Sequence, residues 1–305
     1  MTMHKLGKPP QTLAPTMFDT PLPAPPGPLL SEPEFEHFRG FLALEAGIDM
    51  GPDKRALVQS RLAPRLRSLR CSSFTDYWNA LQGSNAQRER EHAINLLSTN
   101  ETYFFREPQH FAWLQDRALE LSRQRGSPVR VWSAACSTGE EAYSIAITLA
   151  EALGMQTPWY VYATDINTRV TRFAQRAVFP LVRAQKTPPH LWKKYFQQGL
   201  DEYEGSIRVK PDLARRVEFG NLNLLHGAAS PARDFDVILL RNVLIYFNEE
   251  TKQRVVEQLC SKLAEGGHLL IGHAEVIQQK YLPLVQEAPS RYCYLPERAA
   301  GKGAA

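Results

Sequence analysis

The sequence predicts an all-helical N-terminal domain followed by an α/β domain with a doubly wound, largely parallel sheet. Three observations lead to this prediction. Apolar residues recur at helical spacing through residues 31–98, apolar runs alternate with helical patterns from residue 127 onward, and 305 residues exceed what one domain usually holds. Strands that alternate with helices are typical of a parallel sheet with helices on both faces.

The helical domain is predicted to begin at Ser31, because Ser31 and Glu34 have the spacing of a capping box. Four helices are expected from the spacing of apolar residues. They lie at Ser31 to Leu42 and at residues 53–70, 74–82 and 86–98. Pro64 is expected to kink the second of them, since proline lacks an amide hydrogen.

The α/β domain is predicted over residues 99–296. Helical spacing appears at residues 142–153 and again from Val255 to Leu263, where the helix is expected to end at Gly266-Gly267. Polar sequence with a short alternating piece interrupts the rhythm at residues 182–218, which predicts a small β-rich insertion. Strands are expected at residues 129–132, 159–163, 235–240, 268–272 and 291–295.

The two ends of the chain differ in composition from the rest. Residues 1–30 hold eight of the 22 prolines, and proline cannot donate to a helix or sheet. We therefore expect a disordered proline-rich tail there and a flexible tail at residues 297–305.

Composition excludes several classes of protein. A net charge of +4 favours neither nucleic acid nor direct contact with a membrane, and no run approaches the roughly 20 apolar residues of a membrane span. No apolar secretion signal is visible at the N-terminus. The four cysteines are far apart, without a CxxC pair or zinc-finger spacing. These features predict a soluble cytoplasmic protein with reduced thiols and no metal.

The loop after the first predicted strand, residues 133–141, joins strand to helix without the G-x-G-x-x-G of dinucleotide folds. Glu140 and Glu141 stand at the start of the helix. They would repel a pyrophosphate, which weighs against a dinucleotide-dependent oxidoreductase, and would favour a cationic ligand such as a sulfonium. The alternative is that both acids only complement the helix dipole.

Two further loops follow predicted strands. Asp165 ends the second strand, where an acid can accept hydrogen bonds from ribose hydroxyls; the alternative is a helix N-cap. Arg241 and Asn242 come directly after an apolar run, and we expect them at the mouth of a cleft.

Together these segments resemble the CheR family of chemotaxis receptor methyltransferases over roughly residues 31–295. The sequence departs from the family in its proline tail, in Ala142 where proline is common, and in Ala274 where serine is common. The matching stretches are Thr99 to Arg106, Val131 to Glu141, Ala163 to Ile166, Asn223 to Leu225, Arg241 to Phe247 and Gly272 to Glu275.

The resemblance implies a class I methyltransferase fold with a small antiparallel β-subdomain, S-adenosylmethionine as methyl donor and S-adenosylhomocysteine as product. Arg106 and Tyr246 would be the catalytic residues. The implied cofactor contacts are Asn100, Thr102, Arg106, Glu141, Asp165, Asn223, Leu224, Arg241 and Asn242.

The implied reaction is methyl transfer to glutamate side chains of chemotaxis receptors. A glutamate with a pKa of about 4.3 is already ionised at neutral pH, so no general base is needed. We accordingly expect His273 to be structural. The alternative function is a non-catalytic scaffold or sensor that binds S-adenosylmethionine or S-adenosylhomocysteine; retention of Arg106, Arg241 and Tyr246 argues against it.

The implied partner is the cytoplasmic domain of a methyl-accepting receptor, with no nucleic acid and no second copy of the chain. Lys54, Arg61 and Arg65 fall near one helical face and are expected to contact the receptor; the alternative is an ordinary solvated basic face. The stretch at residues 199–205 resembles the loop with which some family members bind a C-terminal receptor peptide.

Overall fold

The computed structural model describes residues 28–124, 126–230, 232–278 and 282–296. Of the two predicted tails, residues 1–27 and 297–305 lie outside the described residues. Leu30, placed in the tail by its sequence, is buried in the core of the helical region, and its amide donates to Gln59 Oε1.

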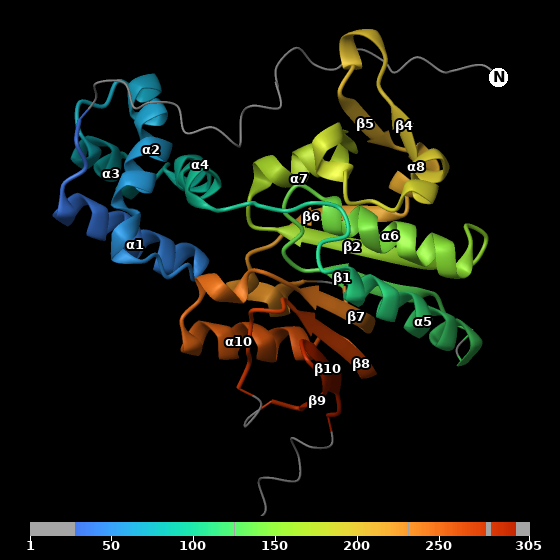
Figure 1. Cartoon of the computed structure of the whole chain (residues 1–305). Coiled ribbons are helices and arrows are strands. Elements are labelled where there is room, and N and C mark those ends of the chain that lie inside the picture. Colours follow the sequence, from blue (N-terminus) through green and yellow to red (C-terminus); the bar gives the residue numbers. More distant parts are fainter. Residues whose placement is uncertain (1–27, 125, 231, 279–281, 297–305) are drawn as a thin grey trace, which may run out of the picture.

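The helical region has the four predicted helices (Figure 1). Ser31 and Glu34 form the expected capping box at its start, and Ser73 and Asp76 form another. Pro64 lies inside the second helix on its exposed side. The helices are α1 (Glu32–Ala46), α2 (Arg55–Leu69), α3 (Phe74–Gln82) and α4 (Gln87–Leu97), with a short 3-10 turn η2 (Pro52–Lys54) before α2.

The main sheet confirms the predicted doubly wound architecture. In the described residues its strand order is β6-β2-β1-β7-β8-β10-β9, parallel from β6 to β8 and antiparallel for the last two strands. Its strands are β1 (Val129–Ser133), β2 (Trp159–Asp165), β6 (Val217–Asn221), β7 (Phe235–Leu240), β8 (Leu263–Ile271), β9 (Leu284–Ala288) and β10 (Arg291–Tyr294).

Helices cover both faces of this sheet, and each face has its own core. On one face α5 (Pro108–Gln124) and α6 (Glu140–Leu153) bury apolar side chains against Val131 and Leu239. On the other face α10 (Glu249–Cys260) packs against Ile238. α7 (Thr168–Gln175) lies beside β6 and links the sheet to α4.

A second, antiparallel sheet interrupts the α/β order, as predicted (Figure 1). It begins at Val178, ahead of the predicted range, and the last residues of that range already belong to β6. Its order is β3-β5-β4. The segment comprises β3 (Val178–Pro180), η3 (Leu181–Ala184), α8 (Pro189–Tyr195), β4 (Phe196–Gln198), η4 (Asp201–Tyr203), β5 (Ser206–Val209) and α9 (Pro211–Ala214).

One predicted helix boundary was wrong. The helix predicted from Val255 to Gly266-Gly267 ends at Cys260, and β8 starts at Leu263. The β7–β8 register shifts after Phe235, so the chain loops out before it pairs again at His268. Gly266 allows this loop because its φ of 71° is readily adopted only by glycine.

Two short 3-10 segments complete the fold near the strand ends, η5 (Leu224–Ala229) and η6 (Leu244–Tyr246). None of the helices in the described part of the chain combines the length and apolar character that a membrane span requires.

Candidate active site

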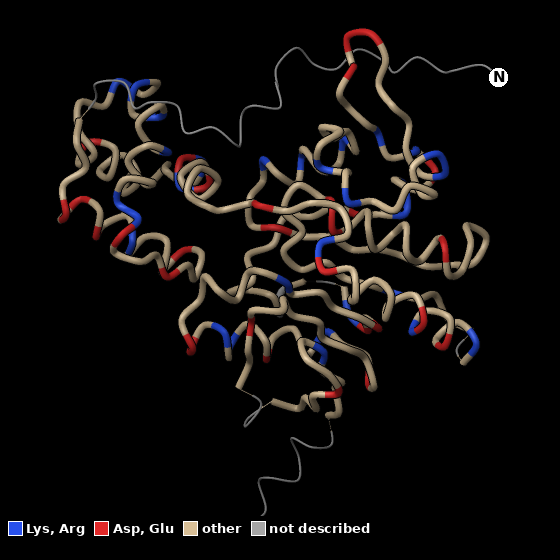
Figure 2. The backbone as a smooth tube through the Cα atoms, in the orientation of Figure 1, with Lys and Arg blue, Asp and Glu red and all other residues tan. Residues whose placement is uncertain are grey.

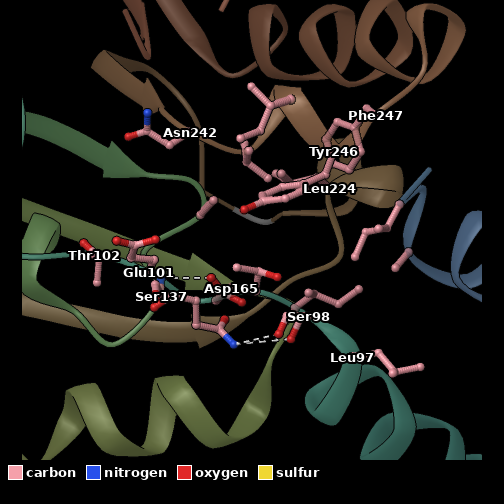
Figure 3. A pocket seen from close by; sticks show the side chains of 18 of the residues that line it. Leu97, Ser98, Glu101, Thr102, Ser137, Asp165, Leu224, Asn242, Tyr246 and Phe247 are labelled. Atoms are coloured by element: carbon pink, nitrogen blue, oxygen red, sulfur yellow. Dashed lines mark hydrogen bonds between the residues drawn. The ribbon is translucent and has the colours of Figure 1, made fainter. Parts of the chain in front are cut away.

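A cavity of about 500 Å³ lies where the carboxyl ends of β1, β2 and β7 face the helical region (Figure 3). This edge is where ligands bind in doubly wound sheets. Every predicted cofactor contact lines this cavity, as do Tyr246 and Lys54. These residues are Asn100, Thr102, Arg106, Glu141, Asp165, Asn223, Leu224, Arg241 and Asn242. The structure therefore brings together predicted cofactor contacts that lie up to 142 positions apart in the sequence, from Asn100 to Asn242.

The loop between β1 and α6 forms one side of the cavity. The Cys136 amide donates to Thr164 O at 2.9 Å, which holds the loop against β2. Gly139 turns the chain into α6 with a φ of 98°, and a Cβ there would lie 2.7 Å from the Cβ of Ala174. Only glycine fits this close turn. The turn places Glu140 and Glu141 at the start of α6.

Glu141 faces the cavity. Its Oε1 accepts a hydrogen bond from Ser133 Oγ at 2.7 Å, and its Oε2 accepts one from Arg241 Nη1 at 2.8 Å. Burial raises the pKa of Glu141, although Arg241 acts in the opposite direction. A ligand cation placed here would further favour the charged carboxylate.

Glu140 points away from the cavity, although its charge, like that of Glu141, was expected to favour a cationic ligand. Its side chain is 1% exposed and accepts a hydrogen bond from Thr138 Oγ1 at 2.6 Å. Arg183 lies 3.9 Å away. Burial raises the pKa of Glu140 to about 7. A cationic ligand in the cavity would therefore meet Glu141 and not Glu140.

Asp165 ends β2 with its carboxylate at the cavity. Its Oδ2 accepts from the Ser137 amide and its Oδ1 from the Asn167 amide, both at 2.9 Å. Burial raises the pKa of Asp165, and these two hydrogen bonds act in the opposite direction. The N-cap of α7 is Asn167, so the alternative of Asp165 as a helix cap was wrong.

Arg241 is buried against the sheet, whereas its place directly after an apolar run predicted a position at the mouth of a cleft. Its side chain is 0% exposed. Nη1 donates to Glu141, and Nη2 donates to Glu107 Oε2 at 3.1 Å and to the carbonyl of Arg106. Two carboxylates thus compensate for the burial of one guanidinium.

Asn242 is held in the left-handed region, with a φ of 58°. Its amide donates to Glu275 Oε2 at 2.8 Å, and its Nδ2 donates to Glu107 Oε1 at 3.2 Å. Glu275 also accepts from the amides of Gly272 and Ile245. One buried carboxylate therefore shapes the loop that carries Tyr246.

Glu107 and Glu275 were missed as site residues. Glu107 directly follows the stretch from Thr99 to Arg106, and Glu275 ends the stretch from Gly272, so the resemblance was the available signal. Neither residue lines the cavity, and both act on side chains that do. Their roles are visible only in three dimensions.

Tyr246 and Arg106 also line the cavity. Figure 3 shows the Tyr246 ring pointing into the cavity, on the side opposite Asp165. Burial raises the pKa of Tyr246, so its hydroxyl keeps its proton at neutral pH. Within the described part of the chain, the hydrogen bond of Arg106 runs from Nη1 to Glu101 O at 3.0 Å. Its Nη2 and Nε remain available to an incoming acceptor.

The helical region closes the cavity through a few links. The Asp49 amide donates a hydrogen bond to Tyr246 O at 2.7 Å, and Ile48 forms a β-bridge with Phe247. Asn223 Nδ2 donates to Glu45 O at 2.6 Å. These contacts join the part of the helical region that lines the cavity to the loops after β6 and β7.

All three predicted receptor contacts are engaged within the chain, and Lys54 forms an exposed ion pair with Asp53. Arg61 donates to the carbonyls of Leu97 at 2.8 Å and Ser98 at 3.0 Å. Arg65 forms an ion pair with Glu89. Lys54 is exposed and lies at the rim of the cavity.

The cavity fits S-adenosylmethionine in three respects. Glu141 supplies negative charge for a cationic ligand, the Asp165 carboxylate can accept ribose hydroxyls, and the apolar side chains of Ile166 and Leu224 suit a flat base. This fold and site are those of a class I, S-adenosylmethionine-dependent methyltransferase.

Comparison with known proteins narrows the class to a family. Residues 100–290 match the family "CheR methyltransferase, SAM binding domain", and residues 33–98 match "CheR methyltransferase, all-alpha domain". Chemotaxis protein methyltransferase 2 of Pseudomonas aeruginosa is 42% identical over 243 residues, which are 79% of this chain and 86% of that protein. The chemotaxis protein methyltransferase of Salmonella typhimurium is 40% identical over 247 residues, 81% of this chain and 84% of that protein. The chain belongs to the CheR methyltransferase family.

Proposed function

We propose that this enzyme transfers a methyl group to glutamate side chains on the cytoplasmic domain of chemotaxis receptors, and so forms glutamate methyl esters. The names of its relatives support a role in chemotaxis. The observation that carries the chemistry is one cavity lined by the acidic Glu141 and Asp165 and by the basic Arg106. Such a cavity suits a cationic donor beside an anionic acceptor.

The donor would be held by the sheet side of the cavity. When bound, S-adenosylmethionine supplies an electrophilic methyl group on a positively charged sulfur. Glu141, with Asn100 and Thr102 near it, would hold the amino acid end, Asp165 the ribose, and Asn223 with Leu224 the adenine. Arg241 and Asn242 would complete this side of the cavity by fixing Glu141 and the loop after β7.

The acceptor needs orientation but no deprotonation. A glutamate has a pKa of about 4.3 and is ionised at neutral pH. Arg106 would bind its carboxylate through the N–H groups that its contact with Glu101 leaves available. Tyr246 would orient the reacting groups through its protonated hydroxyl. Positioning of this kind can contribute on the order of 7–11 kcal/mol to a reaction barrier.

The receptor would approach from the helical side. We propose that residues 31–98 act as the receptor-facing domain and residues 99–296 as the methyltransferase domain. Figure 2 shows basic residues gathered on α2. Lys54 would contact the receptor directly, while Arg61 and Arg65 would add positive charge from their internal positions. Raising the salt concentration should then weaken receptor binding.

The loop at residues 199–205, between β4 and β5, is proposed as a second contact. Figure 2 shows acidic residues at its tip, which are Asp201, Glu202 and Glu204. Binding of a receptor's C-terminal peptide here would raise the local concentration of the receptor without changing the chemistry. Calorimetric titration with receptor-tail peptides tests this contact, and no heat at millimolar peptide would end it.

The decisive assay uses a labelled methyl donor with the cytoplasmic domains of candidate receptors. We expect label in base-labile esters that map to receptor glutamates, and none where those glutamates are replaced by glutamine. Arg106→Ala should lower turnover by on the order of 100-fold while cofactor affinity changes little. Label on another residue type would overturn the glutamate assignment. Cofactor binding without any label would favour a scaffold or sensor.

Gel filtration with light scattering tests a further part of the proposal. We expect the enzyme to act in the cytoplasm as a monomer. A stable dimer at micromolar concentration would contradict this expectation.

A further inference from the structure

Three adjacent strands at the C-terminal end of the main sheet bring a histidine, a cysteine and a glutamate together. They are His268 on β8, Cys293 on β10 and Glu287 on β9, and their ligand atoms all lie within 4.8 Å of one another. None of the three lines the cofactor cavity. The spacing of cysteines along the chain predicted no metal site, and it could not show this grouping because pairing between strands creates it.

The strand register explains why these side chains share one face. Cys293 is the direct antiparallel partner of His268, so both side chains project to the same side of the sheet. On β9 the register passes from Arg291–Ala288 to Tyr292–Gln286, which leaves Glu287 as an extra residue in a β-bulge. Bulges commonly redirect a side chain. Here Glu287 Oε2 comes to 3.1 Å from His268 Nε2.

The histidine is rigidly held. It is 5% exposed, its ring lies 4.9 Å from that of Trp113 on α5, and its buried Nδ1 has no hydrogen-bond partner among the residues that the structure describes. Cys293 is half-buried and Glu287 is exposed, so the group opens to solvent on the side of β9. A rigid platform with one open side is what a metal ion with an exchangeable ligand requires.

The surrounding charges limit which ion can bind. Arg291 Nε lies 3.6 Å from Glu287 Oε2, and its guanidinium stacks over Trp113 at 5.0 Å. Arg117 is engaged by Glu120 and by the carbonyl of Gly266. A hard cation such as Mg²⁺ would gain only one carboxylate here against this positive charge. A thiolate and an imidazole, in contrast, bind softer ions strongly.

We propose that His268, Glu287 and Cys293 form a binding site for Zn²⁺ or a similar transition-metal ion, with water as the fourth ligand. A separation of 3.1 Å between the histidine nitrogen and the carboxylate oxygen suits two ligands that are each about 2.0–2.2 Å from one ion. The ion would cross-link β8, β9 and β10 and stabilise the end of the sheet. This site is independent of the proposed methyl transfer.

Cobalt titration of the purified full-length chain tests the site, with a reductant that contains no thiol. We expect one Co²⁺ per chain at micromolar concentration, a near-ultraviolet band from sulfur-to-cobalt charge transfer, and its loss when Zn²⁺ is added. Trp113 should also report binding, because Co²⁺ beside the His268 ring would quench its fluorescence. Zn²⁺ should raise the melting temperature of the wild-type chain.

Matched variants decide the outcome. Cys293→Ser should abolish the charge-transfer band and Glu287→Gln should weaken Co²⁺ binding at least tenfold, whereas Cys71→Ser, at another half-buried cysteine, should change neither. Glu287 is exposed, so its variant should fold even if the cysteine variant does not. The proposal is overturned if no band appears at hundredfold Co²⁺ excess, or if Glu287→Gln binds Co²⁺ as the wild type does.

Discussion

The two sides of the cavity are built differently. On the sheet side, charged groups are buried and paired: Glu141 and Glu107 hold Arg241, and two backbone amides hold Asp165. The helical side is attached mainly by hydrogen bonds between uncharged groups, among them that of the Asp49 amide to Tyr246 O. Asn95 and Glu91 on α4 add hydrogen bonds to Thr168 on α7, and Glu91 is the one charged partner among these. The sheet side is therefore held by buried charges, and the helical side mainly by uncharged hydrogen bonds.

This difference suggests a division of labour. A small donor that is the same in every reaction cycle suits a preorganised wall, since preorganised groups need no rearrangement when the ligand binds. A receptor is a much larger partner, and it suits the side that is held mainly by uncharged hydrogen bonds. Changes on the sheet side should therefore cost more than changes on the helical side.

The largest effect is expected for Arg241→Ala. It leaves Glu141 and Glu107 buried without their common partner, and breaking a buried ion pair costs about 3–5 kcal/mol. We expect a loss of this size in urea unfolding, together with loss of measurable cofactor binding. Stability within 1 kcal/mol of the wild type would show that the sheet side is not held by these charges.

A pH-dependent effect is expected for Glu140, whose folded pKa is raised by burial to about 7. Because the folded state keeps its proton to higher pH than the unfolded state, wild-type stability falls as pH rises from about 4.5 to 7. Glu140→Gln removes this loss. In urea unfolding the variant should gain on the order of 3 kcal/mol over the wild type between pH 5 and pH 8. A gap that stays constant with pH would contradict the buried titration.

Asp165→Asn should weaken the donor site without unfolding the chain. An asparagine cannot accept both the Ser137 and the Asn167 amides through oxygen, and ribose hydroxyls would lose a charged acceptor. Hydrogen bonds to charged groups contribute about 1.5–3 kcal/mol, so the Kd for S-adenosylmethionine should rise roughly 10- to 100-fold. Calorimetry measures this directly, and an unchanged Kd would remove Asp165 from the site.

The smallest effects separate structure from receptor contact on α2. Arg61→Ala removes hydrogen bonds to Leu97 O and Ser98 O and should cost about 1–2 kcal/mol in unfolding. Arg67→Ala changes an exposed residue and should stay within about 0.5 kcal/mol. Equal stability of the two variants would mean that Arg61 serves the receptor more than the fold.

The sequence predicted the parts of the fold that periodicity encodes. The four N-terminal helices and β1, β2 and β7 fell where apolar spacing placed them. The prediction failed where long-range pairing overrides local pattern. Leu263 continues the helical spacing of α10, yet it pairs with Phe235 as the first residue of β8.

The site was predicted as a set of residues but not as an arrangement. The resemblance located every residue assigned to the cavity, because those residues sit in recognisable stretches. The charges of the loop alone could not show that Glu140 turns inward while Glu141 turns toward the cavity, since neighbours on a helix differ by about 100° around its axis. Nor could the resemblance show that Glu107 and Glu275 hold Arg241 and Asn242, since those contacts depend on packing.

The most direct test of the account is calorimetric titration of S-adenosylmethionine into the purified chain. We expect one molecule bound per chain, with affinity lost when Glu141 is replaced by glutamine and weakened in Asp165→Asn. Absence of binding, or binding that neither replacement changes, would contradict the claim that this cavity holds the methyl donor.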